Sequence, residues 1–143
     1  MVTDLLTGSL NRHGLVSQLS RAIAHRLRSG RPKSVLRFDL DHVKRVNDLH
    51  GDAVGDQVPA GFAARMGAHL RASDALARWG GEAFLLLLPN TPLAGAWTQA
   101  KRLHELVGRA AVADGVPRIT VSGGVAPVAA HAAGSDHSQT LLQ

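Results

Sequence analysis

Two acidic residues and a pair of glycines are the residues best suited to chemistry in this chain. Glu82 follows Gly80-Gly81 between two short apolar runs, and Asp39 lies in an otherwise strand-like stretch, residues 35–40. Glycine accepts the positive φ of a tight turn, so the two runs predict a β-hairpin with bare main chain at its tip. Exposed amides beside a carboxylate suit a metal-bound phosphate compound, and a plain turn is the alternative for this stretch taken alone.

The position of Asp39 in its strand calls for a partner. Alternation places Leu36, Phe38 and Leu40 on one face of the predicted strand and its odd-numbered residues on the other. A carboxylate in a buried strand is costly unless it is paired or bound to a metal. We therefore expect a functional role for Asp39.

Repeating apolar residues predict helices on both sides of this strand. Before it, leucine and isoleucine recur every four residues from Leu15 to Leu27, which predicts an amphipathic helix that ends near Gly30. After it, Asp41 is placed to cap a short helix that ends at Gly51, and a role in a site is an equal alternative for this residue. The apolar stripe of that short helix would consist of Val43, Val46 and Leu49.

Pro59 limits where the next helix can begin. If Asp56 caps that helix, Pro59 falls in the first turn, where its missing N–H costs nothing. An earlier start would place the proline in the helix interior and break it. The inward-facing residues would be Val58, Phe62, Met66 and Leu70.

The remaining elements complete the predicted fold. Thr91-Pro92 begins a long helix, and a strand follows from Arg118 to Val128, with Gly123-Gly124 suggesting a bulge or weak point. The order is helix, strand, two helices, hairpin, helix, strand. This order indicates an α/β (α+β) domain with a mainly antiparallel central sheet covered by helices.

Composition narrows the classes of protein that are possible. With 143 residues the chain predicts one domain, residues 1–143, and it contains no cysteine for disulfides or thiolate metal sites. No apolar run is long enough to cross a bilayer and no signal peptide is visible, so we expect a cytoplasmic location without membrane insertion. The net charge of +5 favours anionic ligands, but aromatic residues make up 3% and offer no stacking platform, so DNA or RNA is not expected as a partner.

Several motifs in a fixed order resemble those of the GGDEF domains, the diguanylate cyclases and their degenerate relatives. The resemblance extends over almost the whole chain. Its motifs are Asp4–Arg12, Phe38–Asp48, Gly51, Gly55-Asp56, Arg78–Phe84 and Thr120–Ser122.

The resemblance implies a nucleotidyl-cyclase-like GGDEF fold and a reaction that joins two GTP molecules into cyclic di-GMP with release of two pyrophosphates. Each domain holds one GTP, so a homodimer is expected. A divalent metal would lower the pKa of the attacking hydroxyl and neutralise charge in the transition state. Mg²⁺, or Mn²⁺, is therefore expected if GTP binds.

The resemblance also assigns roles to individual residues. Asp39 and Glu82 would be catalytic and would hold the metal together with Leu40. The nucleotide would be bound by Asn47 and Asp56 at the guanine and by Lys44, Gly80 and Gly81 at the phosphates.

A second set of residues matches the family's RxxD inhibitory site, which binds cyclic di-GMP. Arg71 and Asp74 stand three apart at the family's offset from Gly80, and Arg78 is expected to assist them. Arginine presents a two-pronged donor to guanine or phosphate, and aspartate accepts from a base edge. An ordinary surface pair is the alternative for these residues without the surrounding motifs.

Two departures from the family pattern bear on activity. The signature reads Gly-Gly-Glu-Ala-Phe, so Ala83 stands where a second acid is usual, and no counterpart of the terminal helix is visible before Gln143. We therefore expect the fold to lack its C-terminal end. The prediction is a degenerate domain that binds guanine nucleotides, chiefly cyclic di-GMP; the alternatives are an active diguanylate cyclase and a structural dimerisation domain.

Overall fold

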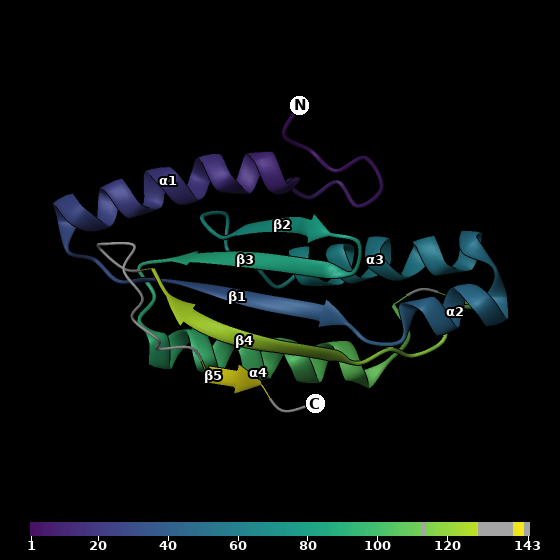
Figure 1. The fold of residues 1–143 in the computed structure, drawn as a ribbon. Coiled ribbons are helices and arrows are strands. Elements are labelled where there is room, and N and C mark those ends of the chain that lie inside the picture. Colours follow the sequence, from purple (N-terminus) through teal and green to yellow (C-terminus); the bar gives the residue numbers. More distant parts are fainter. Residues whose placement is uncertain (113, 129–138, 142–143) are drawn as a thin grey trace.

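The computed structural model describes residues 1–112, 114–128 and 139–141, and these residues form an antiparallel sheet with helices on both faces (Figure 1). The strand order is β2-β3-β1-β4-β5, with every neighbouring pair antiparallel. The strands are β1 (Lys33–Leu40), β2 (Ala75–Gly80), β3 (Ala83–Pro89), β4 (Val121–Pro127) and β5 (Gln139–Leu141). The helices are α1 (Arg12–Ser29), α2 (Val43–His50), α3 (Asp52–Gly67) and α4 (Leu93–Arg109). The predicted fold class is confirmed.

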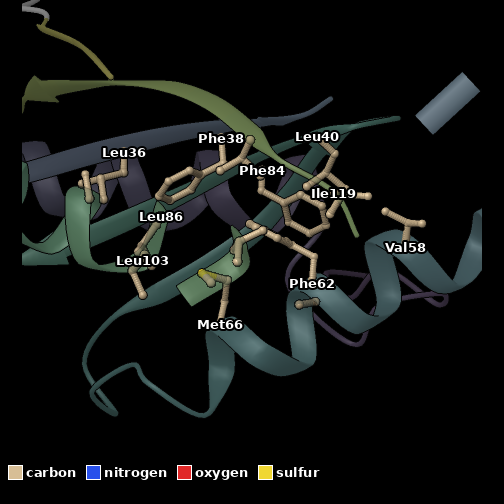
Figure 2. Close-up of a cluster of buried hydrophobic side chains, with 14 of the residues drawn as sticks. Leu36, Phe38, Leu40, Val58, Phe62, Met66, Phe84, Leu86, Leu103 and Ile119 are labelled. Carbon is tan, nitrogen blue, oxygen red and sulfur yellow. The ribbon is translucent and has the colours of Figure 1, made fainter. Parts of the chain in front are cut away.

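The main core lies between the sheet and helices α2, α3 and α4. The even-numbered residues of β1 face it as predicted, with Leu36, Phe38 and Leu40 at most 3% exposed. Phe62 of α3 packs against the rings of Phe38 and Phe84, at centroid distances of 6.0 and 4.8 Å (Figure 2). Burial of these apolar side chains fixes which face of β1 carries Asp39, because successive strand residues point to opposite faces.

Helix α1 covers part of the opposite face of the sheet (Figure 1). Its buried residues Leu15 and Ala22 pack with Ala75, Ala77 and Leu87 of strands β2 and β3. Over β1 and β4 this face carries a cavity of about 510 Å³. Asp39 lines that cavity.

The start of α2 differs from the prediction. Asp41 does not cap the helix, because His42 occupies the N-cap position with a φ of 64°. The Asp41 carboxylate instead accepts hydrogen bonds from the hydroxyls of Thr120 and Ser122, at 2.8 and 2.9 Å. Val43 and Val46 are buried as predicted, whereas Leu49 is 69% exposed and lies outside the core.

Helix α3 begins at Asp52, so Pro59 lies in its interior and the predicted cap at Asp56 is wrong. An interior proline removes one backbone hydrogen bond and costs about 3 kcal/mol. The helix continues because Val58, Phe62 and Met66 are fully buried, and each such side chain contributes roughly 1.5–3 kcal/mol. Those three inward positions are confirmed.

The glycine pair of β4 forms regular ladder positions. Gly123 and Gly124 stand opposite Phe38 and Arg37 without a register shift, so the predicted bulge is absent from this pairing. The strand also begins at Val121 rather than at Arg118. The irregularity of the sheet lies in the hairpin, where the register shifts between Arg78 and Gly80.

Two further findings concern the ends of the chain and its helices. The sequence predicts that the C-terminal end of the fold, with its terminal helix, is missing. This prediction concerns residues 129–138 and 142–143, which lie outside the described residues. Within the described part of the chain, no helix has both the length and the apolar character needed to span a membrane.

Candidate functional site

The β2–β3 hairpin ends in the Gly80-Gly81 turn, and two arginines hold this tip in place. Gly81 has a φ of +30°, a backbone conformation that would be strained for a residue with a side chain. Arg78 Nε donates to the Gly81 carbonyl at 3.0 Å. Arg12 Nε donates to the Trp79 carbonyl at 3.0 Å, and the Arg12 guanidinium lies 4.3 Å from the centre of the Trp79 ring.

The second anchor of Arg78 is Asp4, whose carboxylate lies 3.5 Å from its Nη1. Partial burial alone would raise the pKa of Asp4. The hydrogen bonds from Thr7 and the charge of Arg78 outweigh that effect and hold the pKa below its ordinary value. Asp4 is therefore a charged anchor that ties the N-terminal segment to the hairpin.

A cavity of about 210 Å³, here called the tip cavity, lies between the hairpin tip and helices α2 and α3. It is lined by Leu40, Val43, Asn47, Gly55, Asp56, Pro59, Arg78, Gly81 and Glu82. The structure thus brings together in one place the predicted guanine readers, the hairpin acid, one of the two glycines and Leu40.

Asn47 lines this cavity and carries a buried acceptor that is turned toward Gly55 of α3. Its Oδ1 is buried and has no hydrogen-bond partner among the described residues. A Cβ added at Gly55 would lie 1.3 Å from that oxygen, so only glycine lets α3 approach Asn47 this closely. Sequence analysis gave Gly55 no such role, because the contact joins two helices. An orphaned buried polar atom is costly.

Asp39 does not line the tip cavity. It lies on the other face of the sheet, where Arg37 Nε donates to its Oδ2 at 2.9 Å and Arg37 Nη2 donates to its Oδ1 at 3.0 Å. The main chains are nevertheless adjacent, because the Leu40 amide donates to the Glu82 carbonyl at 2.9 Å. The side chains of Asp39 and Glu82 therefore approach this point from two different cavities.

Two other predicted phosphate-binding residues stand apart. Lys44 and Gly80 are exposed, and neither lines the tip cavity. A Cβ added at Gly80 would meet Arg12 at 3.8 Å, so the space above this glycine is open.

The residues at the end of β1 do not fit a resident Mg²⁺ ion in this arrangement. Mg²⁺ is usually held by one or two carboxylates together with waters and substrate phosphates. Both oxygens of Asp39 are bound by Arg37, and Ala83, which pairs with Asp39 in the ladder, offers no second acid on that face. Among the described residues no three histidine, aspartate or glutamate side chains gather closely enough to hold a metal ion.

Arg71 and Asp74 line a second cavity of about 300 Å³, here called the Arg71 cavity. Asp74 accepts from the Arg71 amide at 2.9 Å and from its guanidinium at 3.0 Å, and its side chain is 1% exposed against 57% for Arg71. Arg71 Nη2 also donates to Pro89 O and Thr91 Oγ1, at 3.2 and 3.0 Å. The structure does not bring Arg78 to this pair, since Arg78 lines the tip cavity.

Arg102 of α4 is the residue of the Arg71 cavity that sequence analysis missed. Its guanidinium donates to Gln99 Oε1 at 3.2 Å and to the His69 carbonyl at 3.4 Å. In the sequence it is one of several cations on the polar side of a helix, with nothing to separate it from Lys101 or Arg109. Its place beside Arg71 follows from the packing of α4 below the sheet.

The sequence of this chain is similar to a protein-family model and to curated proteins. The family model described as "Diguanylate cyclase, GGDEF domain" matches residues 1–142. The response regulator PleD of Caulobacter vibrioides is 36% identical over an alignment of 146 residues, and this alignment covers 99% of this chain and 32% of PleD. The diguanylate cyclase DgcM of Escherichia coli is 38% identical over 123 residues, which cover 86% of this chain and 30% of DgcM. The chain thus spans about a third of the length of these curated relatives.

Solved structures agree with the fold. The GGDEF domain of DgcB from Caulobacter crescentus in complex with c-di-GMP superposes with a TM-score of 0.80 at 31% sequence identity. That alignment covers 88% of this chain and 74% of the DgcB chain.

Proposed function

The chain belongs to the GGDEF family, and from this premise we propose that it is a degenerate member that binds cyclic di-GMP in the Arg71 cavity and guanine nucleotides in the tip cavity. As a module for bacterial second-messenger signalling it would act in the cytoplasm. The proposal rests chiefly on one observation, the presence of two arginines in one cavity with one of them held by a buried aspartate.

The Arg71 cavity suits a ligand that carries two phosphates and two guanines. Asp74 holds Arg71 from one side and leaves more than half of its side chain exposed. Arg102 supplies a second cation to the same cavity. Guanidinium groups donate two parallel hydrogen bonds to a phosphate or to guanine O6 and N7. The relative DgcB, crystallised with c-di-GMP, supports the same ligand class.

The tip cavity suits a guanine base. Asp56 can accept from guanine N1–H and N2–H, whereas adenine does not offer that pair of donors. Asn47 lines the same cavity, and its amide nitrogen can donate to an acceptor of guanine. Arg78 and Glu82 stand at the mouth of this cavity, beside the bare turn at Gly81.

Cyclase activity is the alternative function. It would require two copies of the domain facing each other, each with a GTP, and a charged carboxylate set at the end of β1. Ala83 removes one acid from that set, and each lost charge-assisted contact lowers the rate by on the order of 10²-fold or more. Incubation with GTP and Mn²⁺ followed by product chromatography tests this point, and clear formation of cyclic di-GMP would establish the alternative.

Calorimetry with cyclic di-GMP tests the binding proposal. We expect the parent protein to bind and the Arg71→Ala variant to bind at least about 100-fold more weakly, because a bidentate charge-assisted contact is lost. Arg109→Ala, at the far end of α4, is the matched control and should bind like the parent. Equal affinity of parent and Arg71→Ala, or no binding by the parent, would contradict the proposal.

A further inference from the structure

The open face of the sheet carries an ion pair where a metal would be expected. Arg37 and Asp39 are two residues apart on β1, so their side chains share one face. The guanidinium engages both carboxylate oxygens, at 2.9 and 3.0 Å. The hydrogen bond and the charge of Asp39 raise the pKa of Arg37, which is consistent with a close pair.

The surroundings of Arg37 leave space for its long side chain. In the ladder Arg37 stands opposite Leu85 on β3 and Gly124 on β4. The glycine has no side chain to occupy the face, and the resulting cavity of about 510 Å³ is lined by Arg37, Asp39 and Gly124 among others. The guanidinium can therefore lie along the strand and reach Asp39.

The other side chains near Asp39 either form hydrogen bonds elsewhere or are apolar. Asp41, the next acid along the same face, accepts from Thr120 and Ser122. Ala83 faces Asp39 across the ladder and is an apolar, buried residue. Among the described residues at this end of β1, the cationic partner of Asp39 is Arg37.

The pair contributes little to stability. The side chains of Arg37 and Asp39 are 52% and 43% exposed, and solvent screens the attraction within an exposed ion pair. Its main consequence is chemical, because the guanidinium occupies two of the roughly four lone-pair sites of the carboxylate and its positive charge disfavours a second cation beside it. Arginine also keeps its charge at every accessible pH, so proton loss does not release Asp39.

We propose that the Arg37 guanidinium takes the place of a divalent cation at Asp39, so that this chain binds guanine nucleotides without a resident metal ion. The part that concerns nucleotides rests on the proposed function. The part that concerns the metal does not, since it depends on Arg37, Asp39 and Ala83 alone.

Titration with Mn²⁺ alone tests the exclusion of metal, with free Mn²⁺ followed by electron paramagnetic resonance and no nucleotide present. We expect Arg37→Met to bind Mn²⁺ up to about fivefold more tightly than the parent, because the ion no longer competes with a guanidinium for Asp39 and an exposed pair is a weak competitor. Adding Ala83→Glu to Arg37→Met should raise the affinity further, because a second carboxylate then faces Asp39.

Matched variants separate this effect from general changes. Arg37→Gln also removes the charge but keeps a polar side chain, and it should bind Mn²⁺ as tightly as Arg37→Met. It takes the place of Arg37→Met in the titration if that variant folds poorly. Asp39→Asn in the Arg37→Met background should return Mn²⁺ binding to the parent level. Equal Mn²⁺ affinity of the parent and both single variants, whether tight or absent, would overturn the proposal. Because no nucleotide is present, that result would leave cyclic di-GMP binding by Arg71 untouched.

Discussion

Two arginine–aspartate pairs lie in different cavities of this domain, Arg71–Asp74 just before β2 and Arg37–Asp39 near the end of β1. Both are bidentate, with closest distances of 3.0 and 2.9 Å. In the first pair the aspartate is 1% exposed and the arginine is open to the cavity. In the second pair both partners are about half exposed.

The difference in burial gives the same two side chains opposite roles. In the proposed function, the buried carboxylate of Asp74 is a fixed support that presents Arg71 to a ligand. In the further proposal, Arg37 on the open sheet face competes with a cation for the carboxylate of Asp39. On these two proposals, an arginine–aspartate pair supports ligand binding where the aspartate is buried and opposes it where both partners are exposed.

The largest difference between the pairs is expected in stability. Asp74→Ala should lower the free energy of unfolding by about 1–3 kcal/mol, because it leaves the Arg71 amide without its acceptor in the turn before β2. Asp39→Ala should change it by less than about 0.5 kcal/mol, since its pair is exposed. Urea unfolding of both variants measures the two values, and equal losses would show that burial does not distinguish the pairs.

The next effect concerns the second cation of the Arg71 cavity. Arg102→Ala should weaken cyclic di-GMP binding by about tenfold, less than Arg71→Ala, because its guanidinium lines the same cavity without a carboxylate to hold it. Calorimetry gives the affinity. Lys101→Ala, at the neighbouring exposed position on α4, is the control, and a loss as large as that of Arg102→Ala would indicate a general charge effect instead.

A small, pH-dependent effect is expected for a third pair, Arg78–Asp4, whose side chains are 22% and 21% exposed. The pKa of Asp4 is lowered in the folded protein, so its contribution to stability is present above its unfolded pKa of about 3.9 and is lost as the pH falls through the lower folded value. Asp4→Asn should therefore be less stable than the parent at pH 7, by under about 1 kcal/mol, and equal to it near pH 2. A pH-independent difference would mean that shape rather than charge is responsible.

Local patterns were sufficient to predict most of the fold. The alternation in residues 35–40 predicted which side chains of β1 enter the core, and Gly80-Gly81 predicted the hairpin. The errors fall where two segments meet. Asp41 was predicted as a helix cap or, equally, as a site residue, but it accepts hydrogen bonds from Thr120 and Ser122, which lie 79 and 81 residues further on. Pro59 was predicted near a helix start, but the burial of its neighbours carries the helix through it.

For the candidate sites, the sequence by itself determined which chemical groups are available: an arginine and an aspartate three apart, an asparagine and an aspartate for a base, and one acid in place of two in the hairpin. The tertiary structure decided which groups share a cavity. It placed Arg102 beside Arg71, Gly55 against Asn47, and Asp39 with Arg37 on the opposite face from Glu82. The physical reason is that residue type sets charge and hydrogen-bonding capacity locally, whereas the direction of a side chain follows from which face of each element is buried against the rest of the fold.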